Sequence, residues 1–170
     1  MLDTYCEYII KRKKGVKEGL VITGIVLLGL ILFYIVPGLV SMVSFISFLS
    51  PLAMVAIAYG AYKLVTNFNI EFEYTLTGSD LDIDKITNRA KRKRVISVAR
   101  NEIDIVAPLG SDALPPLNNV EIIDASSHLK EAKIYVMTVN QDTKKAIYFE
   151  PNGEMIARLK ERNPKKVFTE

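Results

Sequence analysis

The residue types best suited to chemistry in this sequence are five basic side chains that occupy five of six consecutive positions. Arg and Lys side chains bind phosphate and carboxylate groups, and each contributes about 1 kcal/mol near an anionic membrane surface. We interpret the cluster as a contact for anionic lipid headgroups. The alternatives are a solvated loop that pairs with Asp80, Asp82 and Asp84, and a contact with a protein partner. The cluster consists of Arg89, Lys91, Arg92, Lys93 and Arg94.

Three alternating acidic residues, Asp80, Asp82 and Asp84, copy the first three ligand positions of a calcium-binding EF-hand loop. The rest of that motif is absent, because Lys85 stands where glycine is needed and Lys91 where a bidentate Glu is needed. We therefore interpret the three as the solvent-facing side chains of a strand. With one His and one Cys, the chain also lacks the ligands of the usual zinc sites, so we expect no metal.

A serine–histidine grouping, Ser126-Ser127-His128, is the nearest approach to a nucleophile and its base. Adjacent residues do not usually form that hydrogen bond, and no Gly-x-Ser-x-Gly, phosphate-binding or dinucleotide glycine pattern is present. We expect neither catalysis nor a cofactor. The net charge of +3 is too small to suggest nucleic acid as a partner.

The chain divides sharply by composition. Residues 19–62 are 44 positions without an ionisable Asp, Glu, Lys, Arg or His, and 32 of them are apolar. All 22 basic and 19 acidic residues therefore lie in the other 126 of the 170 positions. This division predicts a membrane-embedded α-helical hairpin joined to a water-soluble module.

Forty-four residues suit two spans, since one span takes roughly 20. The Pro37-Gly38 pair predicts a break between spans at 19–36 and 40–62, with Pro51 kinking the second. In the alternative, residues 39–50 lie at the interface and a short span begins at Pro51. The small residues Ala56 and Gly60 are candidates for close helix packing. Packing of the second span against the first is enough to explain this pair.

Basic residues flank the apolar block at Lys11–Lys14, Lys17 and Lys63. Such flanks stay in the cytoplasm, so we expect a multi-pass protein of the plasma membrane with both termini cytoplasmic. Residues 1–18 form a basic, amphipathic segment in which Leu2, Tyr5, Cys6 and Ile9 have helical spacing. This predicts an interfacial helix or a frayed start of the first span. We expect Cys6 to be an unmodified thiol rather than a palmitoylation site.

The water-soluble module, residues 69–170, changes to a period of two, as in half-buried strands. A helix follows over 153–162, with Met155, Ile156 and Leu159 on one face, and Pro164 ends it. Seven antiparallel strands and one C-terminal helix is the element order of a pleckstrin-homology-like (PH-like) domain of mainly β, α+β class. Another small β-sandwich is the alternative. The predicted strands are 70–76, 81–85, 92–99, 103–106, 120–124, 133–139 and 144–150.

The sequence also resembles a family of bacterial two-span membrane proteins that share a domain of unknown function. The resemblance runs nearly from end to end, and it implies this architecture without implying a chemistry. The strand–turn–strand at 75–86 resembles bacterial PH-like domains. The stretches that carry the resemblance are Thr75–Ile86, Lys91–Arg94, Ile123–Ser127, Phe149–Asn152 and Pro164–Phe168.

These observations lead to two hypotheses of function. The first is a non-enzymatic binding or scaffold module, anchored in the bilayer, whose basic cluster contacts anionic lipid. The second is a structural subunit of a larger membrane complex, recognised through Ala56 and Gly60. An unidentified protein partner is compatible with either.

Overall fold

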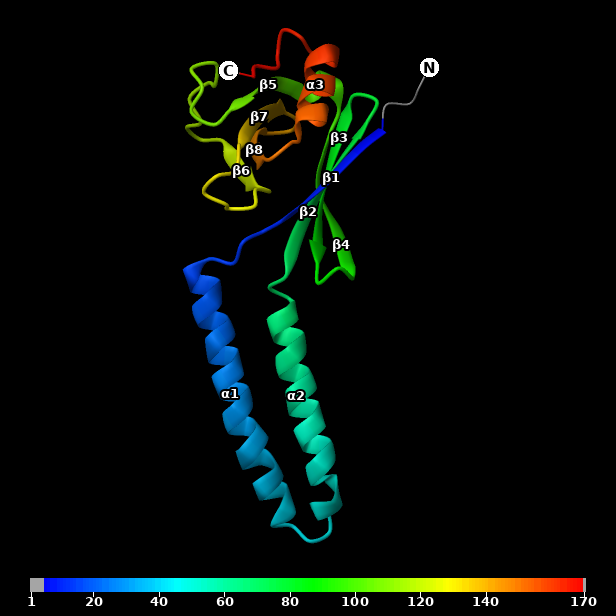
Figure 1. Cartoon of the computed structure of the whole chain (residues 1–170), viewed down its shortest axis with the longest axis vertical. Helices are drawn as coiled ribbons and strands as arrows, with labels where there is room; N and C mark the ends of the chain where they lie inside the picture. The colour runs from blue at the N-terminus through cyan, green and yellow to red at the C-terminus, as the bar shows by residue number, and fades with distance from the viewer. Residues whose placement is uncertain (1–4, 170) are drawn as a thin grey trace. The chain divides into compact units, whose positions relative to one another are not determined.

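The computed structural model describes residues 5–169 and divides the chain into two compact units (Figure 1). The helical hairpin comprises residues 14–69, and the sheet unit comprises the described residues up to Lys13 together with those from Ile70 onward. The sheet unit is therefore discontinuous in sequence, because the hairpin is inserted between its first and second strands.

The hairpin consists of α1 (Val16–Ser41) and α2 (Ser50–Thr66), preceded by a short 3-10 turn, η1 (Ser47–Leu49). The predicted break at Pro37-Gly38 is wrong, because α1 continues through both residues. A proline removes only one helical hydrogen bond. The chain instead reverses after Ser41. Serine hydroxyls bind one carbonyl in the last turn of α1 and one in the following loop: Ser41 Oγ donates to Gly38 O at 2.7 Å, and Ser47 Oγ donates to Ser44 O at 3.0 Å.

Pro51 does not kink a helix, because it lies in the first turn of α2, where its missing N–H costs nothing. The start of α2 at Ser50 is close to the start at Pro51 that the alternative prediction of a short second span gave. Residues 39–41, which that alternative placed at the interface, belong to α1. α1 and the helical stretch Ser47–Thr66, made of η1 and α2, are long and apolar enough to cross a membrane, by length and composition. No residue of α1 is buried within the protein.

Sheet A is antiparallel with strand order β1-β2-β3-β4, and its first strand overturns the helix predicted for the N-terminal segment (Figure 1). Cys6 and Ile10 are buried with Tyr8 between them, so the segment follows a period of two. Pairing with β2 satisfies the backbone groups along one edge of β1, and local spacing does not predict this long-range pairing. Leu2 lies outside the described residues. The strands are β1 (Tyr5–Lys11), β2 (Ile70–Thr77), β3 (Asp80–Thr87) and β4 (Lys91–Val98).

Sheet B has the order β5-β7-β8-β6, and its outer strand β6 is parallel to β8. The seven predicted strands are all present, but residues 5–169 hold eight strands in two sheets, and one pair is not antiparallel. Parallel neighbours need a long connection, and residues 125–143, which include β7, supply it between β6 and β8. The elements are η2 (Arg100–Glu102), β5 (Ile103–Pro108), β6 (Glu121–Asp124), β7 (Tyr135–Asn140) and β8 (Lys144–Phe149).

The C-terminal helix α3 (Gly153–Arg162) is confirmed, with Met155, Ile156 and Leu159 buried. It begins at Asn152, whose Oδ1 accepts a hydrogen bond from Met155 N at 2.8 Å. Its apolar face joins one core with residues of both sheets, where the rings of Tyr74 and Phe149 meet edge to face at 5.9 Å. Two packed sheets and a C-terminal helix are consistent with a PH-like fold.

Candidate functional site

The predicted basic cluster, residues 89–94, forms the β3–β4 turn and the start of β4. Asn88 and Arg89 have φ of 52° and 54°, the left-handed conformation of a tight hairpin turn. Ile70 pairs with Thr87, and Thr87 pairs with Lys91. The cluster therefore lies at the end of sheet A where the chain arrives from α2. Lys11, the last residue of β1, is opposite Glu71 at the same end.

A β-bulge sorts the cluster onto two faces of sheet A. Ile96 and Val98 are buried in the core, and strict alternation would place Arg92 and Arg94 on that same side. The register shifts between Ile83 and Asp84, so that Ile83 is opposite Ile96 but Asp84 is opposite Arg94. The arginines thereby reach the face opposite the core, which we call the charged face.

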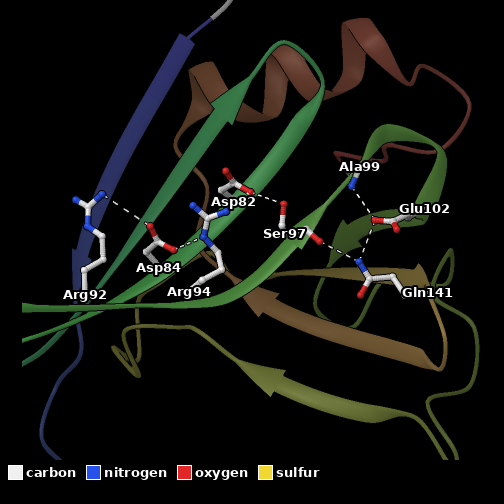
Figure 2. Close-up of polar contacts among 8 residues, drawn as sticks. All are labelled: Asp82, Asp84, Arg92, Arg94, Ser97, Ala99, Glu102 and Gln141. Atoms are coloured by element: carbon white, nitrogen blue, oxygen red, sulfur yellow. Dashed lines mark hydrogen bonds and ion pairs between the residues drawn. The ribbon is translucent and has the colours of Figure 1, made fainter.

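On the charged face each arginine meets carboxylates of the neighbouring strands (Figure 2). Arg94 binds Asp84, and its Nη1 lies 2.7 Å from Asp82 Oδ1. Arg92 lies 2.5 Å from Glu73 and 3.8 Å from Asp84. The two innermost carboxylates are almost fully buried, Glu73 with 3% and Asp84 with 6% of their surface exposed, so these arginines neutralise charges that would otherwise be desolvated alone.

The lysines of the cluster lie on the other face. Lys93 is opposite Lys85, which is opposite the buried Phe72, and Lys91 follows in the next row of that face. Lys91 and Lys93 are exposed, and within residues 5–169 neither has an ion pair. Arg89, in the turn, lies 3.5 Å from Glu71 while three quarters of its side chain stays exposed. Lys91 and Lys93 are thus the members of the cluster left open to a ligand.

A pair of carboxyl groups, Glu7 and Glu73, completes the charged face. Burial raises the pKa of Glu73, and its hydrogen bond to Glu7 raises it further. The same hydrogen bond lowers the pKa of Glu7, as does the bond from the Tyr5 hydroxyl. Of the two groups, Glu73 is therefore the one that keeps a proton to higher pH, and in that protonated form it donates to the Glu7 carboxylate.

The three aspartates lie on β3, but the expectation that all of them face solvent is wrong: Asp80 is exposed, Asp82 is half-buried and Asp84 is buried. Each has a partner. Asp82 accepts a hydrogen bond from Ser97 Oγ at 2.6 Å, and Asp80 accepts one from Arg100 N at 3.2 Å. Asp84 binds the two arginines of β4. Among the described residues no group of three or more His, Cys, Asp or Glu side chains has the arrangement of a metal site.

Two members of the Ser126-Ser127-His128 grouping form hydrogen bonds to the carboxylate of Asp124. Asp124 Oδ1 accepts hydrogen bonds from the backbone N and the hydroxyl of Ser126, and Oδ2 lies 2.6 Å from His128 Nε2. Partial burial opposes ionisation of Asp124, but the bonds from His128 and Ser126 lower its pKa overall. Ser126 thus donates to the aspartate and not to a histidine base, which is the geometry of a turn.

The motifs at 123–127 and 149–152 join the two sheets, a role that sequence reasoning missed. The Tyr74 hydroxyl donates to Ala125 O at 2.7 Å and accepts from Glu150 N at 3.2 Å. Burial raises the pKa of Tyr74, so the hydroxyl keeps its proton. Ser127 N donates to Glu150 Oε1 at 2.6 Å. These bonds connect β2 of sheet A to β8 and the segment after β6, contacts that no local pattern signals.

Further along sheet A, Gln141 in the β7–β8 turn forms a second connection (Figure 2). Its Nε2 donates to Ser97 O and to Glu102 Oε2, both at 2.9 Å. Glu102 also accepts from Ala99 N at 2.8 Å, and the bonds from Gln141 and Ala99 together lower its pKa. The end of β4 is therefore fixed, while its beginning carries the open lysines.

In the hairpin a close contact between the helices involves Gly29, which was not among the predicted small residues. A Cβ added at Gly29 would lie 3.2 Å from Ala61 Cβ, whereas one at Gly60 would have nothing within 4 Å. Ala56 is exposed. Gly29 and Ala61 thus form one close contact between α1 and α2, whereas Gly60 has open space where a side chain would lie.

Comparison with known proteins gives one finding. Residues 2–169 match the family described as "Bacterial PH-like domain (DUF6106)". No curated protein and no solved structure matches the chain.

Proposed function

Since the chain belongs to the family of bacterial PH-like domains (DUF6106), we propose that it is a membrane-anchored, non-enzymatic binding or scaffold protein. The hairpin spans the plasma membrane twice, and the sheet unit works on the cytoplasmic side. Lys91 and Lys93 contact anionic lipid headgroups there.

The pairing of β1 with β2 carries the proposal of a double span. These strands flank the hairpin directly and are neighbours in one antiparallel sheet, so both ends of the hairpin must return to the same side of a membrane. Two helices, each long enough to cross, satisfy that requirement where one would not. The lack of buried residues in α1 also distinguishes it from the core helix of a soluble protein.

The flanking charges support a cytoplasmic sheet unit. Lys11–Lys14 and Lys17 precede the apolar part of α1, and Lys63 lies in the last turn of α2. The turn between the helices has no ionisable side chain. Basic flanks remain in the cytoplasm.

Chain length supports contact between the lysines and lipid. Three residues separate Thr66, the end of α2, from Ile70, a reach of roughly 14 Å. Ile70 is in the same row of sheet A as Lys91. The short link tethers this end of the sheet close to the membrane surface, where unpaired lysines are attracted to anionic headgroups.

The anchoring is tested with single cysteines, for which Cys6 is a favourable background because it is buried. We expect Ser44→Cys to react with an impermeant maleimide on intact cells. Lys144→Cys, on an exposed site of β8, should react only after permeabilisation. Labelling of both variants on intact cells, or of Lys144→Cys alone, would contradict the proposed topology.

The lipid contact is tested by amine acylation of the full chain in nanodiscs. Acylation of Lys91 and Lys93 should slow about three-fold or more with phosphatidylglycerol relative to phosphatidylcholine, and about 0.5 M salt should abolish the difference. Lys144 is the control that should not respond. Equal acylation rates in the two lipids would exclude the contact.

The exposed Ala56 and the open space beside Gly60 favour a second candidate, a structural subunit of a membrane complex. In that case Gly60→Leu should abolish co-purification of partner membrane proteins, because a side chain there would block a close approach. Lys91→Gln/Lys93→Gln should leave co-purification unchanged. The reverse pattern would favour the binding module.

A further inference from the structure

A cavity of about 620 Å³ lies within the sheet unit, away from the basic cluster of β4. Its volume is in the range of small-molecule sites. Three separate stretches line it: β1 and the residues that follow, the connection from β6 to β7, and the segment between β8 and α3. The lining residues that matter are Tyr8, Lys13, Lys130, Glu131, Lys133 and Glu150.

Hydrogen bonds fix the walls of the cavity to one another. Lys13 N donates to Ser127 O at 2.7 Å, which holds the end of the β1 segment against the β6–β7 connection. Ser127 N in turn donates to Glu150 Oε1, and Glu150 N donates to the Tyr74 hydroxyl. The cavity is thus preformed by backbone and buried contacts, which lowers the ordering cost of binding.

The charges on the lining point to an anionic ligand. Lys13, Lys130 and Lys133 are exposed, and within residues 5–169 none of them has an ion pair. Lys133 Nζ lies 5.7 Å from the centre of the Tyr135 ring. Of the two carboxylates, Glu150 already accepts the Ser127 N–H, and Glu131 remains exposed. The lining thus carries three lysines against two carboxylates, and the lysines without an ion pair are free to bind an anion.

We propose that this cavity binds a phosphate group, with Lys13, Lys130 and Lys133 as its cationic ligands. The phosphate belongs either to a phospholipid headgroup or to a soluble phosphate ester. The lipid source rests on the proposed function: Lys13 is three residues before Val16, the start of α1, so the chain keeps it within roughly 10 Å of that helix.

The test uses the full chain and two matched variants that each remove two positive charges. Lys130→Gln/Lys133→Gln alters the cavity, and Lys91→Gln/Lys93→Gln alters β4. Calorimetry in neutral-detergent micelles measures binding of glycerol 3-phosphate, with glycerol as the uncharged control. Amine acylation in nanodiscs of phosphatidylglycerol or phosphatidylcholine measures protection of Lys13, Lys130 and Lys133. Circular dichroism confirms that both variants fold.

Weakening of glycerol 3-phosphate binding by about ten-fold or more in the cavity variant, and by less than about two-fold in the β4 variant, would support a soluble ester as ligand. Protection of the three lysines by phosphatidylglycerol without binding of the ester would support the headgroup. If neither compound binds at the cavity, or if both variants lose binding equally, the proposal is overturned. Acylation of Lys91 and Lys93 is measured in the same nanodiscs as a separate quantity. A loss of lipid contact on β4 can therefore be distinguished from a loss of binding at the cavity.

Discussion

Arginines and lysines of one short segment, Lys91–Arg94, have different surroundings on the two faces of sheet A. Arg92 and Arg94 bind carboxylates on the charged face, whereas Lys91 and Lys93 lie on the opposite face without an ion pair in the described chain. The density of positive charge in a sequence therefore overstates the charge available to a ligand. Here the arginines have a structural role, and two of the five basic residues remain fully available for binding.

The division follows the chemistry of the two side chains. A guanidinium is planar and offers several N–H donors at once, so Arg94 reaches both Asp82 and Asp84. A lysine ammonium is a hydrated point charge, better suited to a mobile lipid surface. The hairpin shows a similar contrast: Gly29 lies close to Ala61 of the other helix, whereas Gly60 has open space beside it.

The largest loss of stability should come from removing β1, because it pairs with β2 along the whole strand and its side chains contribute to both faces of sheet A. A fragment of residues 66–170 would expose Phe72, Tyr74 and Leu76 along an unpaired edge. We expect it to aggregate or remain unfolded. The matched protein, in which residues 1–13 are joined by a short Gly/Ser linker to residues 70–170, should show a cooperative thermal transition. A folded, monomeric 66–170 fragment would show that β1 is dispensable.

The difference between the arginines and the lysines of β4 is tested by neutralising each pair in turn. Arg92→Gln/Arg94→Gln leaves Glu73 and Asp84 buried without cations, and should destabilise the sheet unit by about 2 kcal/mol, since the half-exposed arginines are partly screened. Lys91→Gln/Lys93→Gln should change stability by less than about 0.5 kcal/mol. Hydrogen exchange of β2 and β3 amides in the full chain measures both. Equal effects would remove the distinction between the two faces.

A pH titration sharpens the description of the charged face. Because the pKa of Glu73 is raised in the folded state, that state binds more protons than the unfolded chain above the ordinary value of 4.5. Stability should therefore fall as pH rises from about 4.5 through the raised value. The lowered pKa of Glu7 gives the opposite dependence, with stability lost as pH falls below 4.5.

Glu73→Gln separates these two contributions, because the amide still donates a hydrogen bond to Glu7. In this variant the loss of stability above pH 4.5 should disappear, while the loss at acid pH, which comes from Glu7, should persist. The measurement is hydrogen exchange of β1 and β2 amides between pH 4 and 7, corrected for intrinsic rates. A decline that persists unchanged in the variant would assign it to another group.

The smallest effect is expected in the hairpin. Gly29→Leu places a side chain against Ala61 and should separate α1 from α2, reducing the yield of a disulfide engineered between the helices. Gly60→Leu meets open space and should leave that yield unchanged. A loss of cross-linking in Gly60→Leu would mean that the hairpin packs through this residue after all.

Much of the fold was predictable, for reasons visible in particular residues. The alternation Ile70, Phe72, Tyr74 and Leu76 identified β2, and the spacing of Met155, Ile156 and Leu159 identified α3. The boundary between the helices was not predictable from Pro37, because one lost hydrogen bond does not end a long apolar helix. The sequence located the basic cluster as a segment. It did not show which of the five side chains are free to bind a ligand and which are paired with carboxylates.

The sequence by itself determined which segments are apolar, which alternate and where the charges gather, since these depend on residues close together in the chain. Only the tertiary structure decided that residues 5–11 complete sheet A across the inserted hairpin, that β6 lies parallel to β8, and that a bulge at Val95 turns Arg92 and Arg94 away from the core side. It also brought Lys13 beside Lys130 and Lys133. These features depend on pairing between distant strands, which follows from backbone hydrogen bonding and a shared core and leaves no mark on local spacing.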